Sequence, residues 1–355
     1  MFMKTVKKLA KLIFVDGLAG MASGLFATLI IGTILQQIGG PLGGRVGELL
    51  WLVGKVAMVL TGAGIGLGVG TRLSAAPLTC LSAMCAGMVG SFAAKLLDGS
   101  ILDGSTLVLA GVGEPLGAFL AAMTAVAVGR LVAGRTRVDI LVTPLCCVLS
   151  GAAVGLLIGP SISRFMTQLG ALVNWGVEQQ PLLMGVVVSV LMGMFLTLPI
   201  SSAAIGVILD LSGLAAGAAT IGCCCNMIGF AVASYRENGL GGLLAQGLGT
   251  SMLQMPNIVR RPVIWLPAIL SSAILGPIGT VLLGITGNAT GSGMGTAGLV
   301  GPIMTWQTMT QTQAPGTVAW KLGLMLFVLP ALLSWGIGEL LRRVGWIRPG
   351  DMKLP

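Results

Sequence analysis

Residues 239–261 read GLGGLLAQGLGTSMLQMPNIVRR, and a related stretch, GITGNATGSGMGTAGLVG, occupies residues 284–301. The glycines of both stretches disfavour an unbroken helix, and their hydroxyl and amide side chains would be costly in lipid. Irregular backbone at membrane depth must be buried in protein or line a wet cavity, and a pair of interrupted segments points to a transporter's substrate site. We therefore predict two re-entrant hairpins, near 239–258 and 286–303, around a solute site.

The rest of the chain is strongly apolar. It has 355 residues, of which 55% are hydrophobic and 9% charged, and its mean hydropathy is +0.98. Soluble domains have about 25% charged residues, so the composition indicates an integral protein of the lipid bilayer. The net charge of +9 comes from Lys and Arg at the ends of apolar runs, which membrane orientation explains better than nucleic-acid binding.

No cofactor, metal site or catalytic residue is expected. The seven Cys lie inside apolar segments, and the chain has neither His nor CxxC spacing. Metal and redox sites usually need such ligands. Small apolar residues that pack between helices are the more ordinary interpretation of these cysteines, including the triplet Cys223 to Cys225.

The apolar runs predict an all-α polytopic membrane protein with about ten transmembrane helices. The expected spans lie near 13–37, 48–70, 73–96, 114–134, 139–159, 181–198, 262–285 and 320–341, with two more across 200–236, the first of them short. Other expected features are a surface helix at 1–12, an interfacial segment at 160–180, a linker at 303–319, and a helix-packing stripe of Gly20, Ser23, Gly24 and Ala27.

The charges orient these spans. With a cytoplasmic N-terminus, ten crossings place the Lys and Arg clusters inside and the acidic loop 97–113 outside. Both termini are then cytoplasmic. The two re-entrant hairpins enter from opposite sides, as inverted repeats do.

Several stretches resemble one family. They are GMASGLFATLIIGTILQQIG at 20–39, VDILVTP at 138–144, LMGVVVSVLMGMFLTLPISSAAI at 183–205, GAATIGCCCNMIGFAVASYREN at 217–238, GLLAQGLGTSMLQMPNI at 242–258 and GSGMGTAGLVGPI at 291–303. Together they resemble the second EIIC-type family of the bacterial phosphotransferase system, which includes perfringolysin-regulator-like membrane proteins and falls within the EIIC sugar permease group.

The resemblance implies an elevator-type permease in the bacterial inner (cytoplasmic) membrane. Residues 1–180, with spans 1–5 and the interfacial segment, are expected to form the scaffold of a homodimer. Residues 181–355, with spans 6–10 and both hairpins, are expected to carry the substrate.

The candidate binding residues follow from the chemistry of a sugar-like solute, which needs amide, carboxylate and backbone groups in a pocket of low dielectric. The first hairpin offers Gln246, Gly247, Thr250, Ser251, Gln254 and Asn257, and the second offers Asn288, Thr290, Ser292 and Thr296. Asn226, inside a span, and Glu114, before Pro115, complete the set. The alternatives are that the hairpin residues only satisfy the ends of broken helices, that Asn226 bonds another helix, and that Glu114 caps a helix start.

Three functions remain open. The first is a phosphotransferase-system permease for a small polar, sugar-like solute. The second is a carrier that works without phosphorylation, and the third is a membrane sensor or regulator with little or no transport. Better known sugar EIIC proteins use a Glu and a His near the sugar, but this chain has no His, so that pair cannot be carried over. A phosphotransferase reaction would need separate EIIA and EIIB proteins.

Overall fold

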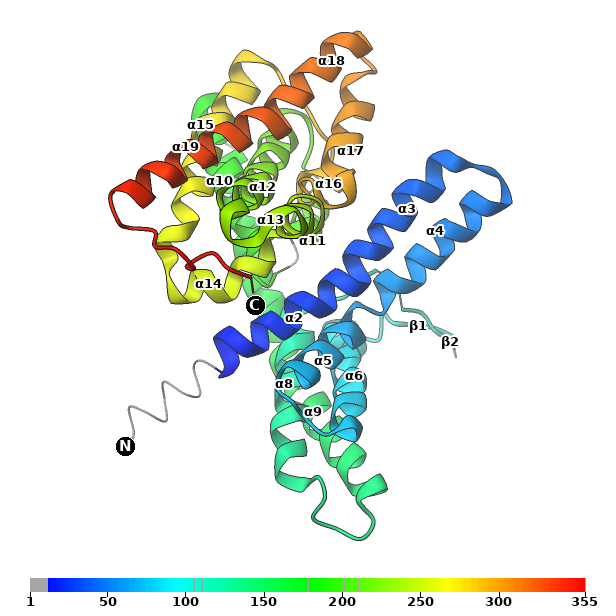
Figure 1. The fold of residues 1–355 in the computed structure, drawn as a ribbon. Coiled ribbons are helices and arrows are strands. Elements are labelled where there is room, and N and C mark those ends of the chain that lie inside the picture. The colour runs from blue at the N-terminus through cyan, green and yellow to red at the C-terminus, as the bar shows by residue number, and fades with distance from the viewer. Residues whose placement is uncertain are drawn as a thin grey trace. The chain divides into compact units, whose positions relative to one another are not determined.

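The computed structural model describes residues 12–104, 106–109, 111–177, 179–200, 202–209 and 211–354. Helices dominate this part of the chain (Figure 1). The strands within it are a two-residue antiparallel pair, β1 (Leu102–Asp103) and β2 (Thr106–Leu107). The all-α fold expected from the sequence is confirmed. The predicted surface helix at 1–12 falls almost wholly outside the described residues.

Six helices in the described ranges are long and apolar enough to cross a membrane, and the pair Gly44–Val59 and Thr61–Arg72, bent by 55°, supplies a seventh. The six are Val15–Leu42, Pro115–Val132, Asp139–Ile162, Gly213–Ala233, Pro262–Leu282 and Pro315–Arg343. Two further apolar helices, Pro77–Ser91 and Pro181–Thr197, are shorter. The polytopic membrane class is thereby confirmed, and the count of ten spans stays a prediction.

The chain divides into two compact units, Met1–Phe165 and Met166–Pro355. The division falls within α9 (Asp139–Val177), which continues through Pro144 and Pro160. The sequence predicts a span at 139–159, which agrees with the apolar stretch Asp139–Ile162, and an interfacial segment at 160–180, into which the helix continues without a break. Proline removes only one backbone donor, and packed membrane helices tolerate that loss. The scaffold and substrate-carrying roles of the two halves remain predictions.

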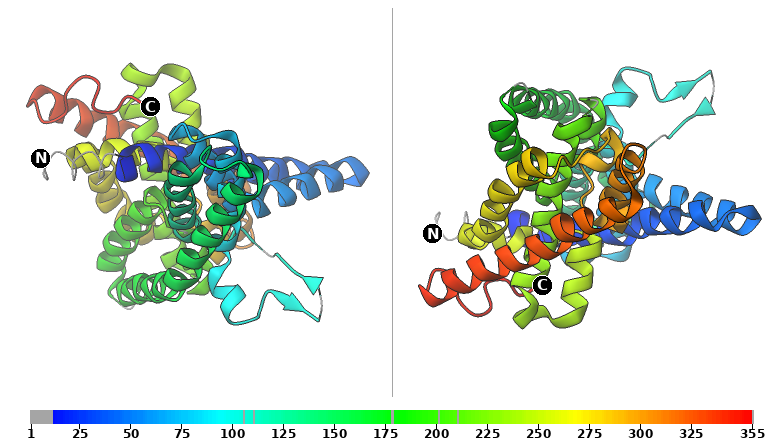
Figure 2. Two further views of the ribbon diagram at one scale, coloured as in Figure 1. Left: turned by 90° about the horizontal axis from the view of Figure 1, so that it is seen from below. Right: turned by 90° about the horizontal axis from the view of Figure 1, so that it is seen from above.

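The first unit is a set of closely packed helices. Its elements are η1 (Leu12–Gly17), α2 (Leu18–Leu25), η2 (Phe26–Ile30), α3 (Ile31–Leu42), α4 (Gly44–Val59), α5 (Thr61–Arg72), α6 (Pro77–Ser91), α7 (Ala93–Leu97), β1, β2, α8 (Pro115–Val132) and the first part of α9. Figure 2 shows α3 and α4 side by side as a long hairpin. Gly43, with a φ of +63°, makes the turn between them.

Glycine sets the distance between the helices of this unit. A β-carbon on Gly20 would lie 2.5 Å from the carbonyl oxygen of Gly68, and one on Gly24 would overlap Gly64. These two positions therefore confirm part of the predicted stripe on α2 and η2, which lies against α5. Ser23 and Ala27 are exposed, so for them the prediction is wrong.

The second unit is built around α12 (Gly213–Ala233), which packs against α10 (Pro181–Thr197), α15 (Leu266–Pro277) and α19 (Leu329–Arg343). The other helical elements of this unit that follow α9 are α11 (Ser202–Ile208), α13 (Tyr235–Leu244), η3 (Ala245–Gly249), η4 (Ser251–Gln254), α14 (Met255–Arg260), η5 (Pro262–Trp265), η6 (Ile278–Leu282), α16 (Ala289–Ser292), η7 (Ala297–Leu299), α17 (Val300–Met309), α18 (Pro315–Leu322) and η8 (Gly323–Val328). Nearly every residue of α12 is buried, as expected for a helix that is apolar all round.

Two sequence expectations for this unit need correction. The predicted linker at 303–319 is largely helical, because α17 buries Thr305 and Met309 and α18 starts at Pro315, a favoured first position. The predicted span after residue 200 contains only the seven-residue α11, whereas a crossing helix needs about 20 residues. Asp210 lies outside the described residues.

Candidate functional site

The first predicted hairpin contains a broken helix. After α13, the chain makes a π-helical turn at η3, becomes extended at Thr250 (φ −159°, ψ 138°) and resumes in the short 3₁₀ turn η4. The Thr250 hydroxyl accepts a hydrogen bond from the Met252 backbone N–H at 3.1 Å. Thr250 therefore satisfies a helix end, which is the alternative role that the sequence left open for it.

The second predicted hairpin is also interrupted. Gly284, Gly295 and Gly298 have φ values of +60°, +52° and +52°, and Leu299 has a φ of +60°. The last is rare for a residue with a side chain. Asn288 caps α16 by accepting from the Gly291 N–H at 2.9 Å, and it donates to Thr308 at 3.2 Å. The backbone here does not form an uninterrupted helix, as the glycine content predicts.

The two broken segments meet at their tips. The Thr296 hydroxyl donates to the Gly247 carbonyl oxygen at 2.5 Å, and both residues are buried. Cys223 of α12 contacts the second segment, where its thiol donates to the Ser292 carbonyl oxygen at 3.6 Å. The structure thus brings Gly247 and Thr296 together, although 49 residues separate them.

Three amide side chains of the first segment form a continuous chain. Gln246 donates to the Ser234 hydroxyl and accepts from Gln254, each at 2.9 Å. Gln254 in turn accepts from Asn257 at 2.8 Å. Gln246 and Gln254 are fully buried and Asn257 is 5% exposed. Three of the predicted site residues are therefore adjacent and hydrogen-bonded to one another.

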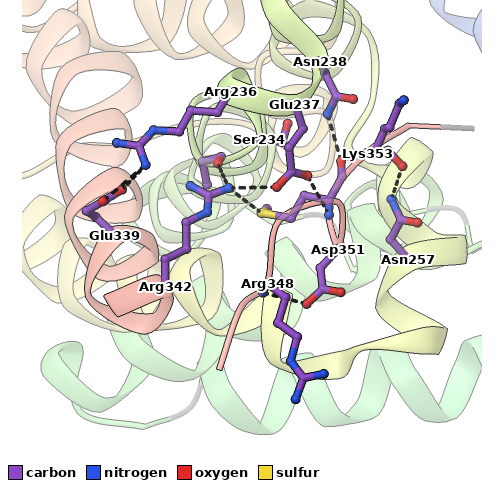
Figure 3. A network of polar contacts seen from close by, with 12 residues as sticks. Ser234, Arg236, Glu237, Asn238, Asn257, Glu339, Arg342, Arg348, Asp351 and Lys353 are labelled. Carbon is purple, nitrogen blue, oxygen red and sulfur yellow. Dashed lines mark hydrogen bonds and ion pairs between the residues drawn. The ribbon is translucent and has the colours of Figure 1, made fainter. Parts of the chain in front are cut away.

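The far end of this amide chain binds the last part of the polypeptide. Gln254 donates to the Met352 carbonyl oxygen, and Asn257 donates to that of Lys353, each at 2.9 Å. Figure 3 shows the surrounding network, in which Glu237 and Asn238 also contact this segment. The sequence prediction missed these partners. The turn-forming run Pro349-Gly350-Asp351 is the signal that could have indicated a returning chain.

Asn226 is the centre of a second buried network. Its carbonyl oxygen accepts from the Trp265 indole N–H at 2.8 Å and from Thr197 at 3.2 Å, and Thr197 bonds Ser251 at 2.8 Å. The Asn226 amide nitrogen donates to the Gly222 carbonyl at 3.2 Å. Asn226 and Ser251 therefore tie α10, α12 and η4 together, which agrees with the interhelical role that the sequence allows for Asn226.

The remaining candidates are dispersed. Thr290 is exposed, and Ser292 is buried with its hydroxyl donating to the Ala289 carbonyl of its own turn at 2.8 Å. Glu114 belongs to the first unit, immediately before α8, whereas the other candidates belong to the second unit. Its Oε1 is buried and has no hydrogen-bond partner among the described residues.

A cavity of about 310 Å³ in the second unit is lined by Val232, Tyr235, Arg236, Leu243, Trp335 and Arg342. None of the predicted site residues lines it. Two of its cations are paired, Arg236 with Glu339 at 3.3 Å and Arg342 with Glu237 at 3.4 Å. Among the described residues, no group of three or more His, Cys, Asp or Glu is placed to hold a metal ion.

No curated protein matches the chain. The sequence model of a family described as "Phosphotransferase system, EIIC" matches residues 15–354, a range that contains the apolar helices, both broken segments and the amide chain. The chain therefore belongs to this EIIC family and is a membrane permease component of the phosphotransferase system.

Proposed function

We propose that the chain translocates a small polar, sugar-like solute, which binds where the two broken segments meet. The observation that carries this proposal is the contact between Thr296 and the Gly247 carbonyl at 2.5 Å. It joins the tips of two interrupted segments next to α12, the most buried candidate span of the second unit. Interrupted helices that expose backbone groups inside a membrane protein are typical of solute sites.

The polar groups near the tips favour a neutral, polyhydroxylated solute. The buried polar side chains of the two broken segments are amides and hydroxyls, namely Gln246, Thr250, Ser251, Gln254, Asn257, Ser292 and Thr296. A charged solute would need an opposite charge to offset its desolvation. Amides and hydroxyls instead both donate and accept, as sugar hydroxyls require.

The proposal extends to the mode of transport. Residues 181–355 would move as an elevator against the scaffold of a homodimer formed by residues 1–180, with the broken segments as opposed re-entrant hairpins. The charge distribution supports a cytoplasmic membrane location with both termini inside. Each of these points comes from the sequence pattern and the family.

The chain itself contributes no phosphorylatable His. Separate EIIA and EIIB proteins would carry the phosphoryl group, and this chain would present a solute hydroxyl to the phosphorylated EIIB. A solute that accumulates without modification would favour a carrier that works without phosphorylation. A protein that binds a sugar and does not move it would favour a sensor.

The first test is thermal stabilisation of the purified protein by a panel of sugars, polyols, sugar acids and small vitamins. A ligand at a hundred times its Kd stabilises a protein by about 2.7 kcal/mol. Thr296→Val removes the hydroxyl at the tip contact, and we expect it to weaken the binding of any stabilising solute by about tenfold, because one buried hydrogen bond contributes about 1–1.5 kcal/mol.

The matched control is Thr290→Val, which changes an exposed threonine of the same segment and should leave binding unchanged. Equal weakening by both variants, or none by either, would remove the site from the tip contact. Uptake in membrane vesicles with and without EIIA, EIIB and phosphoenolpyruvate then shows whether the solute arrives phosphorylated.

A further inference from the structure

The segment 345–354, which we call the strap, follows α19 and returns to α13 and α14 (Figure 3). Two of its side chains, Ile347 and Met352, are buried at 2% and 1% exposure in a cluster with Phe230, Ile258 and Trp265. Most of its other residues are exposed. The strap is therefore anchored at two points along its length.

The protein holds the strap mainly by its backbone. The Met352 N–H donates to Glu237 at 2.8 Å, and the Met352 carbonyl accepts from Asn238 and Gln254, each at 2.9 Å. The Leu354 N–H donates to Asn238 at 2.8 Å. Side chains that bind backbone carbonyls in this way could bind the oxygens of a polar ligand equally well.

The strap leaves the amide chain no free N–H group. Both amide protons of Gln254 are used, one by Gln246 and one by Met352, and both of Asn257 are used, one by Gln254 and one by Lys353. A solute oxygen can therefore reach the two protons that face the strap, one on Gln254 and one on Asn257, only by displacing a strap carbonyl. The two occupants are mutually exclusive at these atoms.

The strap has features of a segment that can detach. It contains no helix or strand, Gly345 has a φ of +82°, and Gly350, with a φ of +90°, lies within the turn in which the Asp351 N–H donates to the Arg348 carbonyl at 3.1 Å. Its Asp351–Arg261 pair, at 3.7 Å, lies near the surface, with the Arg261 side chain 43% exposed and the Asp351 side chain 15% exposed. Segments with few buried contacts open at a much lower free energy than the core does.

We propose that the strap is a built-in competitor of the solute. While it is docked, the strap occupies one amide proton of Gln254 and one of Asn257, and its release frees these two protons. Release of the strap can affect the tip contact through a short chain of residues. Gln254 bonds Gln246, and Gln246 precedes Gly247, whose carbonyl binds Thr296. This regulation rests on the proposed function of the tip contact as a solute site.

The first arm of the test needs no solute. Hydrogen exchange followed by mass spectrometry on the full chain compares the strap with α12. We expect the strap amides to exchange at least about tenfold faster than those of α12, because the strap opens locally. Met352→Ala should speed strap exchange further and leave α12 unchanged. Exchange of the strap only together with α12 would overturn the proposal, since the strap would then be part of the core.

The second arm measures competition, with glucose, mannitol and gluconate as probes. If the strap competes, weakening it raises the binding-competent fraction, so Met352→Ala should bind the stabilising probe more tightly than the wild type by about the ratio of strap opening seen in the first arm. Trp346→Ala, which changes an exposed strap residue, is the control and should bind as the wild type does.

The outcomes separate the two proposals. A probe that binds Met352→Ala and wild type equally, while the strap exchanges fast, overturns the competition and leaves the solute site standing. If no probe stabilises either protein, the strap does not guard a site for these sugars, and the proposed function weakens with it. A probe that speeds strap exchange in the wild type supports both proposals.

Discussion

At the residue scale, polar side chains that look alike in the sequence have different partners. Asn226 and Gln254 both lie among apolar residues, and both are fully buried. Asn226 bonds neighbouring helices through Trp265 and Thr197, whereas Gln254 bonds the strap. Buried polar groups must find partners, so the sequence predicts that each has one. Which partner it has depends on packing.

Glu114 gives a prediction at this scale. Its Oε1 is buried without a partner among the described residues, and an unpaired buried polar atom is costly. Burying a charge costs more than burying a neutral amide, and Glu114→Gln removes the charge with little change of shape, so we expect it to raise thermal stability by an amount equivalent to about 1–2 kcal/mol. The check is a melting curve in detergent.

Glu48→Gln is the control for this change, because Glu48 is exposed on α4 and its substitution should shift the melting curve very little. If Glu114→Gln instead lowers stability or abolishes stabilisation by a bound solute, Glu114 has a functional partner and rejoins the candidate site.

At the element scale, glycine decides how closely the helices of each unit approach. In the second unit, a β-carbon on Gly222 of α12 would overlap the Ser189 carbonyl of α10, and one on Gly276 would overlap that of Gly185. Such backbone contacts replace the hydrophobic effect as the source of helix association in lipid. They also explain why α12 can be buried on every side.

Gly222→Ala tests this packing. The added methyl group has backbone on its far side and cannot be accommodated without a shift of α10, so we expect a loss of about 1–3 kcal/mol or more. Gly336→Ala, on α19 with no atom near the added carbon, should stabilise by about 0.5–1 kcal/mol through helix propensity. Equal melting temperatures for the two variants would contradict the close approach of α10 and α12.

At the scale of the whole molecule, the distribution of charge predicts the orientation in the membrane. The excess of Lys and Arg in cytoplasmic loops predicts that the acidic loop at 97–113 and the basic connection between α8 and α9, with Arg135 and Arg137, lie on opposite sides of the membrane. The Arg-rich ends of the second unit, the proposed substrate-carrying half, would then face the cytoplasm. This orientation is the one that the proposed transfer of phosphoryl groups from separate EIIA and EIIB proteins requires.

Cysteine labelling checks the orientation. In a Cys85→Ser background, we expect an impermeant maleimide added to intact cells to label Ser100→Cys, which lies in the acidic loop. Arg137→Cys should react only after the membrane is opened, because cytoplasmic loops carry the excess of Lys and Arg. The reverse pattern would invert the topology and place the termini outside.

Local composition alone determined the membrane class, the approximate positions of the apolar helices and the two interruptions at 245–254 and 283–299. Hydropathy and the backbone freedom of glycine act within a few residues, so they can be predicted without knowledge of the fold. Tertiary structure decided that Thr296 reaches Gly247 while Thr290 faces outward, and that the strap satisfies Gln254 and Asn257. Those bonds join residues tens of positions apart, and hydrogen bonding depends on where packing brings each group, which no local pattern encodes.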